Sequence, residues 1–292
     1  MGNENESRRL RDIERIKRMR LLDDIFMKAV LKDNIEAVQV IIRILLRRDD
    51  IVVISVQTQE EISNLVGHSV RLDILAKGED GKLYNIEIER STEGADTKRG
   101  RYNLGAVDWH SLPPGAPYSE LAETWIIFIT EHDAFGKGFP VYTVNRVIEE
   151  TGELFNDEEH ILYVNGAYVG DDDIGRLMAD FRETDPEKMH YQPLARSVRY
   201  FKNTEGGMTS MCSIAEEIRK EGREEGRVEG RVEGRREGRV EGREEGRREG
   251  ICGLISVYRD ELGLDSTAII ERIAARFHLT SEQAAHYVTA QA

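Results

Sequence analysis

The sequence predicts an α/β fold in which a central mixed sheet is flanked by helices. Three observations support this class. A helical run precedes three strand-like segments, and a second helical stretch separates them from a further strand, giving the order helix, three strands, helix, strand. The segment WIIFIT at 125–130 is continuously apolar, which is typical of a strand buried on both faces. Asp80 followed by Gly81 predicts a tight turn between two of the strands.

The expected elements follow from the spacing of apolar residues along the chain. Apolar residues recur at helical spacing over residues 22–48, and Asp49 and Asp50 end this run. After it we expect strands at 51–57, 70–76 and 83–89, a polar helix at 95–108, and strands at 125–130, 141–148 and 160–164. These elements suffice for one sheet with helices on its faces.

Composition excludes several classes of protein. The 292 residues carry 55 acids against 41 bases, a net charge of -14, which excludes a globally basic nucleic-acid binder but not a local basic patch. Cys212 and Cys252 leave little room for a zinc cluster or a disulfide framework, and lone thiols fit a reducing cytoplasm. Because no run of 18 apolar residues occurs and the N-terminus is charged, we expect a cytoplasmic protein with no membrane partner.

Four segments differ in character. They are a charged extension at 1–20, a globular region at 21–218, a repeat at 219–250 and a tail at 251–292. The tail has three short apolar-periodic segments that predict helices, with Ser266 and Ser281 as N-caps of the second and third. A small helical cap and a helix-turn-helix reader both fit this pattern, and the scarcity of basic residues favours the cap.

The repeat has a period of four residues, EGRx, with a glycine at every fourth position from 222 to 250. The period is close to the 3.6 residues of a helical turn, but each glycine destabilises a helix by about 1 kcal/mol relative to alanine. Two interpretations remain: a helical stalk stabilised by close packing on a partner, or a mixed-charge spacer. The nearly balanced charges argue against DNA binding, and we expect the repeat to join copies of the chain into a homo-oligomer.

The turn also fixes the register of the hairpin formed by 70–76 and 83–89. A three-residue loop at 79–81 pairs residues whose numbers sum to 160. One face is then apolar, with Val70, Leu72, Ile74 and Ala76 beside Tyr84, Ile86 and Ile88. The other face carries Arg71, Asp73 and Leu75 beside Asn85, Glu87 and Glu89. A shift of one residue would split both sets, so the pattern supports this register.

Three carboxylates gather on one face of this hairpin. In the predicted register Asp73 lies opposite Glu87, and like charges in such positions destabilise a strand pair. A hard divalent cation, Mg²⁺ or Mn²⁺, compensates for this naturally, because it prefers oxygen ligands. Arg71, opposite Glu89, is an alternative compensation, and a solvated strand face of mixed charge requires no ligand at all.

The hairpin resembles the signature of the PD-(D/E)XK nuclease superfamily, an acid in one strand followed by Glu-x-(polar) in the next. The segments VRLDI (70–74) and YNIEIER (84–90) resemble its metal-binding strands, most closely those of the recombination-promoting nuclease and transposase group. LLDDIFMKAVL (21–31), TKRGRYNLGAV (97–107) and the segment 185–207 are similar to other parts of that group, as is the EG-rich repeat. The resemblance covers residues 20–250. It implies a restriction-endonuclease-like core of the αβββαβ type.

The resemblance also implies a role for each residue of the motif. Asp73 and Glu87 would bind Mg²⁺ or Mn²⁺, joined by the main-chain carbonyl of Ile88, and Glu89 would complete the catalytic set. The group usually has Gln, and the superfamily Lys, where this chain has Glu89. A glutamate there implies a second metal, a general base or lost activity, and Arg71 or Lys98 would have to supply the missing positive charge.

DNA is the partner that the resemblance implies, and no small-molecule cofactor is expected. The residues proposed to contact DNA are the cations and the aromatic residue near the hairpin: Arg71, Arg90, Lys98, Arg99, Arg101 and Tyr102. The function expected is a Mg²⁺-dependent DNA endonuclease connected with recombination or transposition. The alternative is a catalytically inactive nuclease-fold protein that binds DNA or oligomerises. An ordinary solvated helix also explains 95–108, and Trp109 reads more simply as a packing residue.

Overall fold

The computed structural model describes residues 11–62, 70–90 and 95–290. Residues 1–10 of the expected N-terminal extension therefore lie outside the described residues. The chain forms two compact units, Met1–Ile218 and Arg219–Ala292. Within the described ranges, no helix is both long and apolar enough to cross a membrane.

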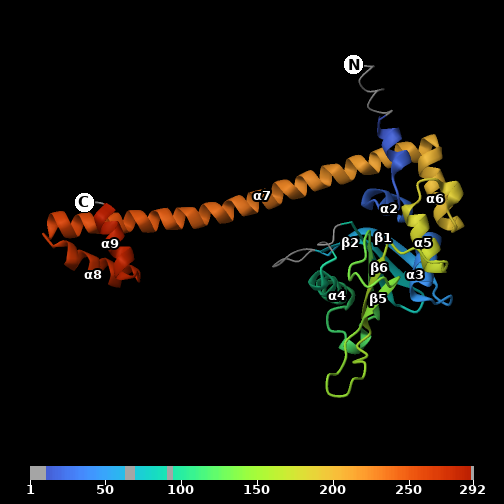
Figure 1. The fold of residues 1–292 in the computed structure, drawn as a ribbon, viewed down its shortest axis with the longest axis horizontal. Coiled ribbons are helices and arrows are strands. Elements are labelled where there is room, and N and C mark those ends of the chain that lie inside the picture. The colour runs from blue at the N-terminus through green and yellow to red at the C-terminus, as the bar shows by residue number, and fades with distance from the viewer. Residues whose placement is uncertain (1–10, 63–69, 91–94, 291–292) are drawn as a thin grey trace. The chain divides into compact units, whose positions relative to one another are not determined.

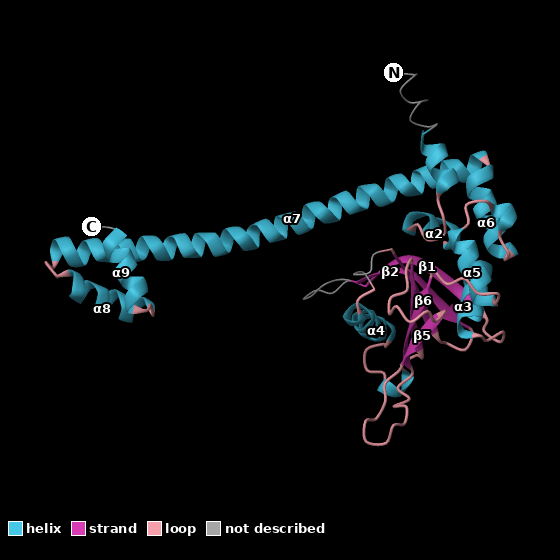
Figure 2. Cartoon of the chain, in the orientation of Figure 1, coloured by secondary structure: helices cyan, strands magenta, loops and turns pink. Residues whose placement is uncertain are grey.

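The first unit is built on a six-stranded mixed sheet with the strand order β1-β2-β3-β4-β6-β5 (Figures 1 and 2). Its strands are β1 (Val53–Ile62), β2 (Val70–Gly78), β3 (Leu83–Glu89), β4 (Thr124–Thr130), β5 (Val141–Val144) and β6 (Glu159–Asn165). The strands β3, β4 and β6 are parallel, and the other neighbours are antiparallel. The expected α/β class with a mixed sheet is therefore confirmed.

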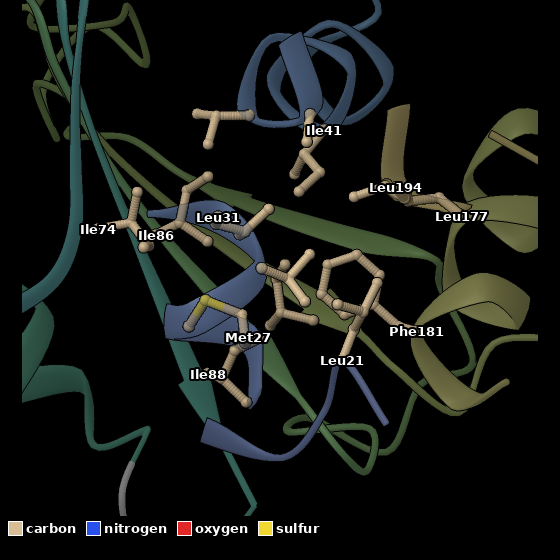
Figure 3. Close-up of a cluster of buried hydrophobic side chains, with 14 of the residues drawn as sticks. Leu21, Met27, Leu31, Ile41, Ile74, Ile86, Ile88, Leu177, Phe181 and Leu194 are labelled. Atoms are coloured by element: carbon tan, nitrogen blue, oxygen red, sulfur yellow. The ribbon is translucent and has the colours of Figure 1, made fainter. Parts of the chain in front are cut away.

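Helices cover both faces of this sheet. One face packs against α2 (Asp24–Leu31), α3 (Ile35–Leu46), α5 (Asp173–Arg182) and α6 (Gln192–Asn203), and the other against α4 (Thr97–Ser111). Figure 3 shows the first core, where Met27 and Leu31 of α2 lie beside Ile86 and Ile88 of β3. Short 3-10 helices occur at Tyr118–Glu120 and Pro186–Lys188. Two separate cores thus hold the sheet from its two sides.

The strand β4 is buried on both faces, as its apolar run predicts. Ile127 and Ile129 belong to the core beneath α2 and α3, whereas Ile126 and Phe128 belong to the core beneath α4. Parallel strands pair with both edges of β4 and helices cover both its faces, which explains why no polar alternation interrupts its sequence.

The helical run expected over 22–48 is divided in the structure into α2 and α3, with a turn between them. Asp33 has a positive φ of 55°, which ends the first helix. Asn34 then caps α3, since its side chain accepts a hydrogen bond from the Ala37 N–H at 3.2 Å. The turn lets both helices present apolar residues to the same core.

The helix α7 (Glu205–Ser256) starts in the first unit, where Met211 joins the core, and continues through the repeat. A π-helical turn (Val257–Glu261), α8 (Ser266–Phe277) and α9 (Ser281–Ala290) follow in the second unit. Their core is formed by Ile251, Ile255, Ile269, Ile273, Ala284 and Val288.

The expected N-caps of the last two helices are each wrong by one residue. Asp265, not Ser266, caps α8 by accepting from the Ala268 N–H at 2.9 Å. For α9 the cap is Thr280 rather than Ser281, because Thr280 and Gln283 exchange side-chain and backbone hydrogen bonds in a capping box.

Candidate functional site

The register predicted for the β2–β3 hairpin is confirmed. The Cα partners run from Ile74 with Ile86 to Lys77 with Leu83, so that each pair of numbers sums to 160. Gly81 has a φ of +85°, and its N–H donates to the Gly78 carbonyl at 3.0 Å to close the turn. This turn requires the left-handed region, which glycine adopts without strain.

Beyond Ile74 and Ile86 the backbone ladder gives way to side-chain contacts. The Asp73 N–H donates to Glu87 Oε1 at 3.2 Å, and the Ile88 N–H donates to Asp73 Oδ2 at 3.4 Å. The two carboxylates thus occupy the gap between the strands, each bonded to the backbone of the opposite strand. Glu87 is fully buried and Asp73 is 8% exposed.

The single apolar face expected for the hairpin is divided in two. Ile74 and Ala76 belong to the core beneath α2 and α3, but Val70 and Leu72 belong to the core beneath α4. The division falls on either side of Asp73, where the ladder to β3 ends. Consequently a residue of α2 contacts Asp73 from one face of the sheet, while a residue of α4 contacts Glu87 from the other face.

Lys28 of α2 provides the cation next to Asp73. Its Nζ lies 2.7 Å from Asp73 Oδ1, and the side chains are only 12% and 11% exposed. The same ammonium lies 2.9 Å from Asp24 Oδ1, one helical turn earlier. Lys28 is held in place by α2, whose neighbouring residues Met27 and Ala29 are buried in the core. The ion pair is therefore fixed by packing on both sides.

Arg99 in the first turn of α4 provides the second cation. Its guanidinium donates to Glu87 Oε2 at 2.9 Å and to Glu89 Oε2 at 2.8 Å, which joins the two acids of β3. The next residue, Gly100, allows α4 to approach the sheet closely, because a Cβ there would lie 3.0 Å from Ile161 Cδ1. This close packing brings Arg99 within reach of the buried Glu87.

Burial and like charge change the proton affinity of the acids. Burial and then the charge of Asp73 raise the pKa of Glu87, against the opposing effects of Asn85 and Arg99, to about 7. Burial also raises the pKa of Asp73, although Lys28 opposes the shift. For Lys28 burial acts downward, but Asp73 and Asp24 outweigh it and raise its pKa. Two desolvated acids in contact repel each other, and any bound cation relieves that repulsion.

The oxygen donors at this position fit Mg²⁺ in kind. Among the described residues, no three acidic, histidine or cysteine side chains are arranged to hold a metal ion. Mg²⁺, however, is held by one or two carboxylates, with waters and substrate phosphates completing its shell. Asn85 donates to Glu87 Oε1 at 2.9 Å, and its own Oδ1 is buried without a hydrogen-bond partner in the described part of the chain. Such an orphaned oxygen indicates room for a water or an ion.

The other residues expected to contact DNA occupy different environments. Arg90 pairs with Glu131 at 3.0 Å and with Asp23 at 3.1 Å, so that it links the end of β3 to other parts of the unit. Arg71 is half-buried and lies opposite Glu61 of β1; the ladder between β2 and β3 does not extend to the expected pair of Arg71 with Glu89. Lys98, Arg101 and Tyr102 of α4 are exposed.

The sequence analysis did not predict Lys28 as a residue of the site, and it placed Asn85 on the polar face of the hairpin without giving it a role. Asp24 and Lys28 stand four residues apart on an otherwise apolar helix, and this pair of charges was the only local signal. Arg99, expected to contact DNA, contacts Glu87 and Glu89 of β3. Lys28 and Asp73 are distant along the chain, and the contacts of Arg99 depend on how α4 packs on the sheet, so neither set can be predicted from the sequence.

Comparisons of the chain with protein-family models, with curated proteins and with solved structures give no match.

Proposed function

We propose that the chain is a metal-dependent nuclease that hydrolyses phosphodiester bonds in DNA. The observation that carries this proposal is the contact between two buried acids, Asp73 and Glu87, on neighbouring strands of a mixed sheet. Burying two carboxylates together is unfavourable unless a cation compensates for them. The resemblance of these strands to the nuclease motif adds the substrate, and its closest group suggests a role in recombination or transposition.

In this proposal Asp73, Glu87 and the Ile88 carbonyl hold Mg²⁺ or Mn²⁺. When bound, the ion supplies a water of lowered pKa and shields the phosphate from the carboxylates. Asn85 orients Glu87, because its amide donates both to Glu87 Oε1 and to the Ile74 carbonyl. The buried position of both acids keeps bulk water away from the donors, which strengthens their attraction for the ion.

Lys28 and Arg99 supply the positive charge that Glu89 cannot. A lysine at the third motif position would steady the charge that develops on the phosphate. Here Lys28 contacts Asp73 and Arg99 contacts Glu87, so a cation stands beside each acid of the pair. Because Arg99 also engages Glu89, we propose that Glu89 positions this arginine.

The same contacts favour a second candidate, an inactive nuclease-fold protein that binds DNA. Lys28 and Arg99 each take an oxygen of the acid pair, and a metal ion would have to compete with them. If the ion pairs are tighter than the metal site, the hairpin is structural and catalysis is absent.

Cleavage of supercoiled plasmid separates the two candidates. We expect the full chain to nick or linearise DNA with Mg²⁺ or Mn²⁺ and to lose that activity in EDTA. Asp73→Asn and Glu87→Gln preserve the shape of the side chain but remove its charge. Each should lower the cleavage rate at least about 100-fold, which corresponds to about 2.7 kcal/mol of transition-state stabilisation by the metal. Asp49→Asn, a change of the same kind at an exposed position after α3, is the matched control. No cleavage by the wild type with either metal would exclude the nuclease.

The variant Glu89→Gln tests the third motif position. A glutamine matches the residue usual in the group that the hairpin resembles, and it still accepts a hydrogen bond from Arg99. We therefore expect measurable cleavage, within about tenfold of the wild type, since one charge-assisted hydrogen bond becomes neutral. Complete loss of activity in a folded variant would contradict the positioning role of Glu89.

A further inference from the structure

An exposed stripe runs along α4 away from the acid pair. Lys98, Tyr102, Gly105 and Trp109 follow the spacing i, i+4, i+7, i+11 and so share one side of the helix. Tyr102 is 46% and Trp109 65% exposed, which rules out the expectation that Trp109 serves for packing. A Cβ added at Gly105 would meet nothing within 4 Å, so the surface between the two rings is open.

The stripe ends in a pocket. Its volume is about 870 Å³, and Trp109, three prolines of the following loop (Pro113, Pro114 and Pro117) and Tyr118 line it. Tyr118 is 83% exposed. Exposed aromatic rings around an open, mostly apolar hollow are unfavourable in water, and their arrangement suits a flat ligand.

Positive charge occupies the start of the same stripe. Lys98 and Arg101 are exposed, and Arg99 between them contacts the buried Glu87. The eleven steps from Lys98 to Trp109, at the helical rise of 1.5 Å per residue, span about 17 Å of helix. Cations near the acid pair and aromatic rings farther away form the pattern of a single-stranded nucleic-acid groove, in which cations follow the backbone and bases stack on rings.

We propose that the exposed stripe of α4 and the pocket at Trp109 and Tyr118 bind single-stranded DNA and lead the strand to the acid pair. Lys98 and Arg101 contact phosphates, while Tyr102, Trp109 and Tyr118 stack against bases. Duplex DNA keeps its bases stacked on each other and cannot occupy the rings, so the site discriminates between strands. That the bound strand leads to the acid pair rests on the proposed nuclease function. That the stripe and the pocket bind single-stranded DNA does not.

Fluorescence anisotropy in EDTA measures this binding without cleavage. We expect the full chain to bind a labelled oligothymidine of 20 nucleotides at least about tenfold more tightly than a 20-base-pair duplex. Trp109→Ala and Tyr118→Ala should each weaken single-strand binding about tenfold, because one stacked base contributes 1–3 kcal/mol. Duplex binding should stay within twofold. Phe155→Ala removes another exposed aromatic ring, 57% exposed, and should change neither affinity.

The tryptophan emission gives an independent readout of stacking. Trp125 is half-buried, donates to Glu123 at 2.8 Å and stacks on His160, so the variant Trp125→Phe leaves Trp109 as the only emitter. We expect oligothymidine to quench this emission and duplex DNA to leave it unchanged. The variant Lys98→Ala with Arg101→Ala should lower the slope of affinity against salt by about 1.4, since each phosphate contact on a single strand contributes about 0.7.

Equal affinity of Trp109→Ala and wild type for oligothymidine would overturn the inference, and so would equal binding of single strand and duplex or binding of neither. The proposed nuclease fails differently: plasmid stays intact with Mg²⁺ or Mn²⁺ while the binding pattern persists. Cleavage without a preference for single strands would support the proposed nuclease and contradict single-strand binding by the exposed stripe of α4.

Discussion

Lys28 and Asp73 form the most constrained contact of the candidate site. Both side chains are nearly buried, their charged atoms are 2.7 Å apart, and they come from a helix and a strand that are distant along the chain. Removing one partner from such a pair leaves an uncompensated buried charge, which destabilises a protein far more than the loss of a surface pair. The pair therefore affects stability as well as the proposed chemistry.

Lys28→Met tests this at the level of stability. We expect the free energy of unfolding in urea to fall by about 3 kcal/mol, because Asp73 loses its buried counter-ion. Adding Asp73→Asn should recover most of that loss in a double-mutant cycle. Lys188→Met is the control, since Lys188 is 68% exposed and lies 3.8 Å from Asp185. Equal losses of unfolding free energy in Lys28→Met and Lys188→Met would contradict a buried ion pair between Lys28 and Asp73.

Asp108 on α4 provides a pH-dependent contribution to stability. Burial, followed by hydrogen bonding to Glu159, raises its pKa to about 7. The folded protein thus holds a proton that the unfolded chain releases near pH 4, so this contribution is complete below that pH and is lost as the pH rises through 7. Urea unfolding from pH 5 to pH 8 should show falling stability.

The variant Asp108→Asn should flatten that profile. An amide can donate to Glu159 at every pH, so we expect the variant to be more stable than the wild type at pH 8, by on the order of 1 kcal/mol. Asp49→Asn, in the exposed turn after α3, should follow the wild-type profile. A profile of Asp108→Asn as steep as that of the wild type would contradict the assigned proton.

At the scale of elements, the contact of α4 with the sheet positions Arg99. Gly100 and Gly105 lie on the same helix but face opposite environments. A Cβ at Gly100 would meet Ile161 and Phe128 at 3.0 and 3.3 Å, whereas one at Gly105 would meet nothing within 4 Å. The same substitution therefore has opposite expected effects at the two positions.

Gly100→Ala should push α4 away from the sheet. We expect overpacking to lower the free energy of unfolding by about 1–2 kcal/mol, measured by thermal unfolding. The ion pair between Arg99 and Glu87 should also weaken. Gly105→Ala should instead stabilise α4 by about 1 kcal/mol, because alanine is the better helix former and its methyl group has space. Equal effects of the two variants would contradict the close approach at Gly100.

The local part of this arrangement is predictable from the sequence. The turn at Gly81 fixed the hairpin register, and the apolar run of β4 indicated burial on both faces, because both signals lie within one segment. The break at Asp33 was missed, since the apolar spacing continues across it. The contacts of Lys28 and Arg99 were missed because they depend on how helices sit on the sheet, which spacing along one element cannot reveal.

At the scale of the whole chain, the repeat is helical in the structure, as part of α7. The glycines at 230, 234, 238, 242, 246 and 250 have open space where a Cβ would stand. Each destabilises the helix by about 1 kcal/mol relative to alanine. Among the described residues, the core of the second unit takes from α7 only residues near its end, such as Ile251 and Ile255. We propose that the repeats of separate copies associate, with glycine permitting close approach of the backbones.

Light scattering coupled to size exclusion tests this association. The full chain should elute with at least twice its monomer mass, and a truncated chain of residues 1–218 should elute as a monomer, because it keeps the first unit and loses the repeat. Circular dichroism of the truncated chain checks that the unit remains folded. Identical oligomeric states for the two chains would contradict assembly through the repeat.

Binding of Mn²⁺ to the acid pair is the most direct test of the proposed site. Electron paramagnetic resonance at pH 8 counts free Mn²⁺ in the presence of the full chain and of Asp73→Asn, Glu87→Gln and the control Asp108→Asn. We predict a site in the wild type and the control whose affinity falls at least about tenfold, or 1.4 kcal/mol, in each of the other two variants. Unchanged Mn²⁺ binding by Asp73→Asn and Glu87→Gln, or no binding by the wild type, would contradict a cation held between these two strands.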